Sequence, residues 1–354
     1  MGQAHVLRRD RAHTLTASST SRSVRPSTRR PRSSRAALRA AADSPGYPTT
    51  IGLPETRQAA IDWLSRRFGV TGLGPDGVLP VIGSKELIGS MAIHLGIGAG
   101  DLIGYPALAY PTYEVGAALA GARALATDSL TAFGPETPRL LWLNSPSNPT
   151  GKVLPLEHLR KVVEWCRERG TIPGLRRVLP RVRPGHRTDQ RAPPRRLRRL
   201  PRGHPQRPLA VQALQPRGLP LRVRRRRPGP VGELLAVRKN LGLQMPMPQQ
   251  RAMIAALDDD AHVVEQHATY AARRAKLKEA LLLAGFTIDH SEASLYLWST
   301  RGEDCWSTVA ALAELGILVA PGDFYGSAGS RHVRVAFTAT DERIDAAVDR
   351  LAGS

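Results

Sequence analysis

Apolar residues recur at helical spacing in some stretches of this chain and form short continuous runs in others. Residues 54–68 place apolar side chains on one helical face and charged ones opposite, and 84–95 also have a helical pattern. Residues 140–143 form an apolar run that ends in a loop rich in Asn and Pro, which predicts a buried strand. Another helical repeat extends from 156 to a glycine at 170. Helices alternating with strands in this way predict a parallel sheet.

The C-terminal third has a different pattern. Its predicted elements are long helical stretches, short strands and a last helix, over about 233–283, 295–298, 317–320, 333–337 and 341–351. We therefore predict an α/β protein with two domains. The large domain covers 41–235 and has a mostly parallel sheet, and the smaller α+β domain covers 236–354.

Positive charge is concentrated in two blocks. The chain of 354 residues carries a formal net charge of +21. Residues 1–40 hold ten arginines and one acidic residue, Asp10, while residues 171–230 hold eighteen arginines and one acidic residue, Asp189. The blocks therefore carry +9 and +17, which leaves −5 for the rest of the chain. That remainder has the mildly acidic balance of an ordinary enzyme.

Neither block contains Lys, Phe, Trp or Tyr, and neither keeps a helical or alternating repeat. We therefore expect both to be poorly ordered and to supply no core element. One interpretation is a pair of nucleic-acid-binding tails on a folded scaffold, although aromatic residues that could stack on bases are absent. Another interprets residues 1–40, which are rich in Ser and Arg, as an organellar targeting peptide.

The remaining composition is that of a globular protein. Hydrophobic residues make up 42% of the chain, and no apolar run approaches the roughly 18 residues of a membrane span. Cys166 and Cys305 lie far apart in the sequence, so no disulfide framework is implied. We expect a cytoplasmic protein without a membrane partner and without a bound metal.

The loop after the predicted strand at 140–143 is the most specific chemical signal. It reads Asn144-Ser145-Pro146-Ser147-Asn148-Pro149-Thr150-Gly151. Polar loops at the carboxyl ends of strands are where α/β proteins bind ligands. A turn rich in Asn and Pro explains the same residues without any ligand, and the pattern alone does not decide between the two.

Four further positions are candidates for binding. Gly83-Ser84-Lys85 opens a helix, where free N–H groups and the helix dipole favour a phosphate, although any capped helix looks the same. Arg334 lies inside an apolar strand, where a guanidinium needs a partner such as a carboxylate, unless that strand face is solvated. Tyr110 and Tyr47 are the other two candidates. Without a ligand, Tyr110 would be a tyrosine of the core and Tyr47 an aromatic residue of a turn.

These motifs together resemble the class I and II aminotransferases, which are fold-type I pyridoxal-phosphate enzymes, and most closely the succinyldiaminopimelate kind. The resemblance implies that Asn148 hydrogen-bonds the cofactor's phenolic oxygen and that Tyr110 stacks on its ring. It assigns the cofactor phosphate to Gly83, Ser84 and Lys85, and the substrate α-carboxylate to Arg334.

The resemblance also implies how the molecule assembles and what it acts on. Tyr47 is expected to reach the cofactor phosphate of the neighbouring subunit of a homodimer. The implied substrates are an amino acid and a 2-oxo acid. The segment 291–298 favours N-succinyl-LL-2-amino-6-oxoheptanedioate with glutamate, in lysine and cell-wall precursor synthesis, while other aminotransferases of the class remain open.

The family also needs a lysine that bonds the cofactor and an aspartate and tyrosine on its ring. No lysine occurs between Lys161 and Lys239, and this window contains the second arginine block. The chain as written therefore supplies no catalytic lysine where one is expected. The motifs of the family are found at about 41–170 and 231–354, and not in the two blocks.

A shifted reading frame accounts for the missing motifs. Residues 175–179 encoded as CTC CGA CGA GTG CTA, read one base later, give Ser-Asp-Glu-Cys-Tyr, which resembles the family's aspartate–tyrosine motif. Residues 211–215 encoded as GTC CAA GCG CTC CAA give Ser-Lys-Arg-Ser-Asn, so the lysine codon spans Gln212 and Ala213. Residues 12–29 reread in the other frame resemble the opening strand of the family. The codons are chosen, so the shift is a hypothesis that the coding DNA tests.

Overall fold

The computed structural model describes residues 19–20, 30–176 and 230–353. The catalytic lysine position at Gln212 and Ala213, the reread segment 12–29 and nearly all of the second arginine block lie outside these residues.

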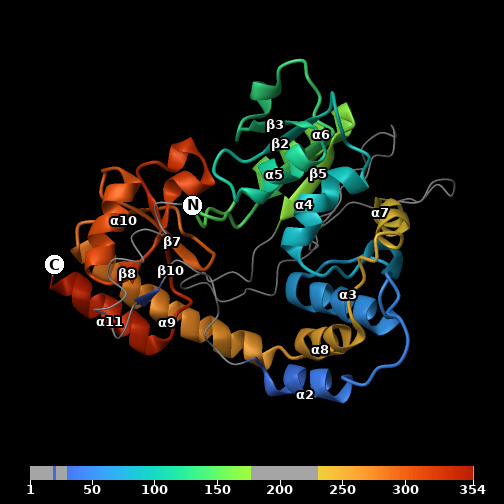
Figure 1. The fold of residues 1–354 in the computed structure, drawn as a ribbon, viewed down its shortest axis with the longest axis horizontal. Coiled ribbons are helices and arrows are strands. Elements are labelled where there is room, and N and C mark those ends of the chain that lie inside the picture. Colours follow the sequence, from blue (N-terminus) through green and yellow to red (C-terminus); the bar gives the residue numbers. More distant parts are fainter. Residues whose placement is uncertain (1–18, 21–29, 177–229, 354) are drawn as a thin grey trace.

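Figure 1 shows two sheets side by side, with a group of helices below them. The described helices and strands are β1 (Ser19–Thr20), α2 (Arg32–Ala40), α3 (Pro54–Phe68), α4 (Ser84–His94), β2 (Leu102–Tyr105), α5 (Thr112–Leu119), β3 (Arg123–Ala126), β4 (Leu140–Asn144), α6 (Leu156–Arg169), β5 (Ile172–Arg176), α7 (Pro230–Arg238), α8 (Met247–Asp258), α9 (Ala261–Leu283), β6 (Thr287–Asp289), β7 (Tyr296–Thr300), α10 (Cys305–Glu314), β8 (Ile317–Leu318), β9 (Ala320–Pro321), β10 (Val333–Ala336) and α11 (Asp341–Ala352).

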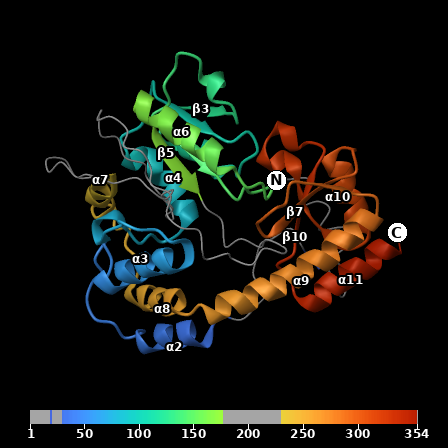
Figure 2. The same ribbon diagram turned by 180° about the vertical axis from the view of Figure 1, so that it is seen from behind.

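The first sheet has the strand order β3-β2-β4-β5, and all its pairs are parallel. Its residues alternate between two cores. Leu140 and Trp142 of β4 pack with α4 and α5 on one face, while Leu141 packs with Val162 of α6 on the other. The two opposite views in Figures 1 and 2 show α4 and α5 on one side of this sheet and α6 on the other. A sheet covered on both faces needs a continuous apolar run, which β4 supplies.

The second sheet has the order β6-β7-β10-β9, and all its pairs are antiparallel. It shares one apolar core with α9, α10 and α11, in which Leu297, Val333 and Phe337 are fully buried. The long α9 runs from α8 to this core, as both views show. The α/β class and the mostly parallel first sheet confirm the fold predicted from the sequence.

Several boundaries differ from the sequence prediction. The helical region expected over about 233–283 is three helices, α7, α8 and α9, separated by turns. The strand expected at 295–298 is shifted to 296–300, and the one at 317–320 is split into β8 and β9. Proline at 246 and 248 accounts for a helix start at α8, because proline is tolerated only in the first turn.

The composition of the first arginine block predicts a poorly ordered segment, but the block contains a helix. Helix α2, Arg32–Ala40, lies within it and packs against α8. Ala and Leu have high helix propensity, and Arg39 in the last turn complements the helix dipole. No residue of α2 is fully buried, so the helix forms without joining the core. An element of only nine residues gives no long apolar repeat, so the sequence pattern did not predict it.

Among the described residues, no helix is long and apolar enough to cross a membrane. Within the same residues, no group of three or more His, Cys, Asp or Glu side chains is arranged to hold a metal ion. Both cysteines are free and buried, and burial raises the pKa of the Cys166 thiol to about 12.

Candidate functional site

The loop after β4 is held in place by its own polar side chains. Asn144 Nδ2 donates to the carbonyl oxygen of Asn148 at 3.2 Å, and Ser145 Oγ accepts from the Leu154 N–H at 3.0 Å. The Gly151 N–H donates to Ser147 O at 2.9 Å. Asn144 and Asn148 are buried, so the bond between them satisfies two polar groups that water cannot reach.

Two loops of the first sheet meet two segments of the second. Thr150 O accepts from the Ser291 N–H at 2.9 Å, and Gly151 O accepts from the Ala293 N–H at 3.0 Å. Tyr325 O accepts from the Ala109 N–H at 2.8 Å in the loop after β2. The carboxyl ends of β2 and β4 therefore face the second sheet directly.

Glycine is required at one of these contacts. Gly151 has φ +71°, and a Cβ there would lie 2.5 Å from Ala293 O and 2.9 Å from Ser291 Cα. Both the left-handed backbone and the close approach exclude a larger side chain. Helix α9 supports the same contact, because Arg274 Nη2 donates to Ser291 O at 2.6 Å.

Arg334 and Asn148 come together at this junction. Arg334 Nη1 donates to Asn148 Oδ1 at 3.0 Å, and both side chains are buried. The guanidinium carbon lies 4.3 Å from the Tyr296 ring centre and 5.2 Å from that of Tyr325. Two aromatic faces therefore hold the guanidinium by cation–π attraction. The sequence identified Arg334 but not the two tyrosines, because their roles depend on cross-strand register and on the turn after β9.

Lys85 and Tyr110 also come together at the carboxyl edge of the first sheet. Gly83 precedes α4 with extended backbone, and Ser84 begins the helix without a side-chain cap. Lys85 Nζ lies 3.4 Å from Tyr110 Oη and 5.4 Å from the centre of its ring. Tyr47, in contrast, is 95% exposed in the loop before α3 and reaches none of these groups within its own chain.

Helix α4 is fixed by a buried ion pair that the sequence did not indicate. Arg238 of α7 is fully buried and donates from two nitrogens to the carboxylate of Glu86, at 2.8 and 3.2 Å. Because Glu86 lies in the first turn of α4, this pair fixes the helix start beside Lys85.

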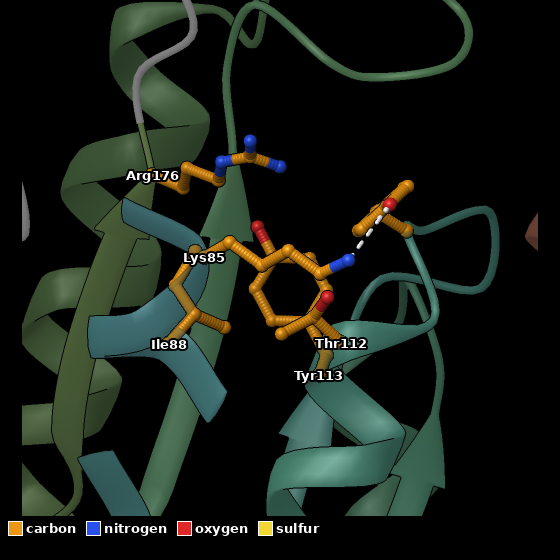
Figure 3. A pocket seen from close by; sticks show the side chains of 6 residues that line it. Lys85, Ile88, Thr112, Tyr113 and Arg176 are labelled. Carbon is orange, nitrogen blue, oxygen red and sulfur yellow. Dashed lines mark hydrogen bonds between the residues drawn. The ribbon is translucent and has the colours of Figure 1, made fainter. Parts of the chain in front are cut away.

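A small hollow lies between the first turns of α4 and α5 and the carboxyl end of β5, and it is lined by Lys85, Ile88, Tyr110, Thr112, Tyr113 and Arg176. Figure 3 shows Arg176 extending over the end of the Tyr113 ring, with Lys85 beside it. The hollow has a volume of about 10 Å³, which is the space of roughly one water molecule. Burial raises the pKa of Tyr113 to about 12, and the charge of Arg176 opposes that rise.

Comparison with known proteins identifies the family. The family model for aminotransferase class I and II matches residues 14–174 and 234–351. The chain therefore belongs to the class I and II aminotransferases, which are pyridoxal-phosphate-dependent enzymes acting on amino acids and keto acids. The match begins inside the first arginine block, so the family resemblance extends further than the motifs at 41–170 indicated. It is interrupted over 175–233, where no lysine occurs.

Two curated relatives share about half of their aligned residues with this chain. A probable aminotransferase of Mycobacterium tuberculosis is 51% identical over 329 residues, covering 89% of this chain and 75% of the relative. The 4-dedimethylamino-4-oxo-anhydrotetracycline transaminase OxyQ of Streptomyces rimosus is 49% identical over 321 residues, covering 90% and 88%.

Solved structures share the fold. A crystal structure of an aminotransferase from Mycobacterium tuberculosis aligns with a TM-score of 0.79 at 21% identity, covering 99% of this chain and 95% of that one. N-succinyldiaminopimelate aminotransferase from the same organism aligns with a TM-score of 0.74 at 22% identity, covering 95% and 93%. At these identities the likeness concerns the fold alone.

The residues described do not fit pyridoxal phosphate as a transaminase holds it. Asn148 and Tyr110 lie at the expected ends of their strands, but Arg176 occupies the end of β5, in register with Asn144 of β4. The reread motif places an aspartate there, which would keep the ring nitrogen protonated, and a guanidinium cannot do this.

Proposed function

We propose that the gene of this chain specifies a transaminase for N-succinyl-LL-2-amino-6-oxoheptanedioate and glutamate, in diaminopimelate and lysine synthesis, and that the chain as written is impaired in it. The observation that carries the proposal is the contact between Arg334 and Asn148 Oδ1 at 3.0 Å. It joins the expected carboxylate-binding residue of one sheet to the expected ring-binding residue of the other.

Arg334 is suited to bind the α-carboxylate of an amino acid. Its guanidinium is buried, so a carboxylate that reaches it does so with little competition from water. The rings of Tyr296 and Tyr325 restrict the guanidinium to one orientation, from which the planar fork can donate two parallel hydrogen bonds. A lysine in the same place would bind as a point charge without that orientation.

In the frame-corrected enzyme, the remaining candidate residues have proposed roles on the cofactor, which supplies an electron sink when bound. Asn148 would donate its amide N–H to the phenolic oxygen, while its Oδ1 accepts from Arg334. Gly83, Ser84 and Lys85 would hold the phosphate at the N-terminus of α4, and Tyr110 would cover the ring. Tyr47 is proposed to act on the phosphate of a second subunit, which its 95% exposure allows.

The substrate proposal rests on two kinds of support. The segment 291–298 resembles the succinyldiaminopimelate kind, and it contributes Tyr296 to the Arg334 contact. The LL-diaminopimelate aminotransferase of Gloeobacter violaceus is 32% identical over 343 residues, covering 89% of this chain and 85% of the relative. The two proposed substrates, N-succinyl-LL-2-amino-6-oxoheptanedioate and glutamate, each carry more than one carboxylate.

A second substrate class has a specific observation in its favour. The relative from Streptomyces rimosus, at 49% identity, is named for an oxo-anhydrotetracycline. Such a substrate is a fused-ring ketone and does not require an α-carboxylate site. The amino donor is an amino acid in both cases, so Arg334 distinguishes the two proposals only in the half-reaction with the acceptor, where its loss should matter for an oxo acid and much less for a tetracyclic ketone.

The test uses a gene corrected in frame over the two blocks, so that residues 175–179 and 211–215 encode the reread motifs. The purified protein is incubated with pyridoxal phosphate and glutamate, and with each candidate acceptor in turn. We expect 2-oxoglutarate to form with the succinylated oxo-heptanedioate. Formation only with the oxo-anhydrotetracycline would favour the second class, and formation with no acceptor would exclude both.

A further inference from the structure

We propose that Trp298 is a positioning residue for Arg334, because its ring supports the ring of Tyr325, which in turn lies on the Arg334 guanidinium. Trp298 thereby sets the direction from which Arg334 meets a carboxylate. The inference rests on the proposed function, since it takes Arg334 as the residue that binds a substrate carboxylate. It goes beyond that function in naming a residue that acts only through another side chain.

Trp298 and Arg334 lie directly opposite each other on neighbouring strands. They are register partners in the antiparallel pair of β7 and β10, so their side chains project from the same face of the sheet. Both are buried, with Trp298 1% and Arg334 6% exposed. Tyr296, two residues before Trp298 on β7, belongs to the same face and supplies one of the two rings on the guanidinium. The strands therefore fix the positions of Tyr296 and Trp298 relative to Arg334.

The second ring on the guanidinium, that of Tyr325, is not fixed by a strand. Tyr325 lies in the turn Gly322–Tyr325 after β9, so its orientation depends on the side chains that it packs against. It meets Trp298 edge to face, with ring centres 6.1 Å apart and ring planes at 83°, a geometry that aromatic pairs favour. A smaller side chain at position 298 would leave a space into which the Tyr325 ring can turn away from Arg334.

Trp298 is itself held by the pair of His332 and Asp289. The imidazole of His332 stacks on the indole, with ring centres 5.0 Å apart and ring planes at 4°. Its Nε2 lies 2.8 Å from Asp289 Oδ2, and because a carboxylate only accepts hydrogen bonds, Nε2 is the donor. Asp289 is the register partner of Trp298 on β6, so the same sheet places the indole and the carboxylate that orients the imidazole.

The apolar cluster around Trp298 borders both parts of the proposed site. Trp298 and Tyr325 belong to one small buried cluster, and Leu108 and Tyr110 of the first sheet's loop pack against it. Tyr110 is the residue expected to cover the cofactor ring. The cluster therefore lies between the residue proposed for the ring and the support of the residue proposed for the carboxylate.

A change in the direction of the guanidinium should weaken substrate binding more than it slows turnover. A guanidinium binds a carboxylate through two parallel hydrogen bonds, which require that its plane faces the two oxygens. The carboxylate is bound in the same way before and during the reaction, so a poorer contact raises KM and leaves kcat nearly unchanged.

The first experiment uses the 354-residue chain without any ligand, isotope-labelled for nuclear magnetic resonance. An aromatic ring shifts the resonance of an N–H proton that lies over its face, and the Arg334 signal is identified by its loss in Arg334→Lys. In Trp298→Leu this signal should move toward those of exposed arginines, and in Trp298→Phe, which keeps an aromatic edge, it should move less. Trp165→Leu is the matched control, because Trp165 also packs against an aromatic ring, that of Phe133, and should leave the signal in place.

Thermal unfolding of each variant checks that the fold is retained. If Trp298→Leu does not fold, His332→Gln carries the test, because it removes the stacked ring and keeps a donor for Asp289. The proposal is overturned if the Arg334 signal keeps its position in the variant that is tested, or if Trp165→Leu moves it as far.

The second experiment measures the kinetics of the frame-corrected enzyme with an amino-acid donor. We expect Trp298→Leu to raise KM at least about threefold with kcat within about twofold of the parent, and Trp298→Phe to recover most of the loss. Arg334→Ala is measured beside them. If it changes nothing, the proposed role of Arg334 fails, while the spectra still decide whether Trp298 positions it. If Arg334→Ala weakens the enzyme but Trp298→Leu leaves KM unchanged, or lowers kcat as much as it raises KM, the positioning role of Trp298 is overturned.

Discussion

Arg334 donates a 3.0 Å hydrogen bond to Asn148 Oδ1, although 186 positions separate the two residues in the chain. The bond connects β10 of the antiparallel sheet to the loop after β4 of the parallel sheet. It forms because the loops after β2 and β4 dock on the segments 291–293 and 322–326, so the relation depends on the whole interface between the two sheets.

The first prediction concerns Arg334 in the frame-corrected enzyme. Arg334→Ala should lower kcat/KM for a dicarboxylic amino acid by about 2–5 kcal/mol, because a bidentate charged contact in a buried place is lost. Arg334→Lys keeps the charge and should recover part of the activity. Steady-state kinetics measure both variants, with Arg167→Ala as the surface control. A loss for Arg334→Ala below about tenfold, or 1.4 kcal/mol, would remove this residue from the substrate site.

A second prediction concerns the ion pair that fixes α4. Glu86→Gln leaves the fully buried guanidinium of Arg238 without a counter-charge, so the free energy of unfolding should fall by about 2–4 kcal/mol. Glu157→Gln, in the first turn of α6, is a matched control and should change it by less than about 0.5 kcal/mol. Urea unfolding measures both. Equal effects of the two substitutions would show that the pair contributes no stability.

The third prediction separates two costs of replacing a glycine, namely a strained left-handed backbone and a steric clash of the new Cβ atom. Gly72 and Gly151 both have positive φ, +77° and +71°, but a Cβ at Gly72 would meet open space. Gly72→Ala should cost about 1 kcal/mol of stability from the backbone alone. Gly151→Ala should cost clearly more, because its Cβ would collide with Ala293 O, and it should also disturb the site loop. Similar unfolding midpoints for the two variants would contradict the close approach seen here.

A fourth prediction concerns pH. The hydrogen bond from Arg273 holds the pKa of Asp341 below its ordinary 3.8. A carboxyl whose pKa is lowered by folding stabilises the protein fully above its unfolded pKa, and loses that contribution as the pH falls through the folded pKa. Asp341→Asn should therefore lower stability at neutral pH, by at most about 1 kcal/mol because Asp341 is 65% exposed.

The difference between Asp341→Asn and the parent should shrink as the pH falls below 3.8, and it should disappear once the pH has passed the lowered pKa of Asp341 in the folded state. Denaturant unfolding at a series of pH values measures it. A difference that persists unchanged at the lowest pH would show that the charge of Asp341 is not its source.

The sequence predicted the elements whose patterns are long or whose loops carry special residues. The bounds of Pro54–Phe68 were predicted without error, because its apolar face and the glycine after it are both local signals. The parallel sheet followed from alternating helices and strands. Helix α2 was missed, since nine residues without a buried side chain give no periodic apolar signal.

The candidate site was predicted in its residues but not in its contacts. Asn148, Arg334, Tyr110 and Lys85 are recognisable from local motifs, and the structure brings them together in two pairs. Tyr296 and Tyr325 on Arg334, and Arg238 on Glu86, depend on register and on packing between elements far apart in sequence. Local patterns hold no information about such partners. The proposed roles of all these residues remain predictions.

The codon for Gln212 tests the central claim most directly. The claim is that the missing lysine of this aminotransferase is present in the gene, one base out of frame. Gln212 followed by Ala213 reads as lysine in that frame only if the glutamine codon is CAA, because the shifted triplet is then AAG. Sequencing the coding DNA should therefore show CAA at Gln212, with CGA at Arg176 giving the aspartate of the ring. A CAG codon at Gln212 would give arginine in the shifted frame and would contradict the account.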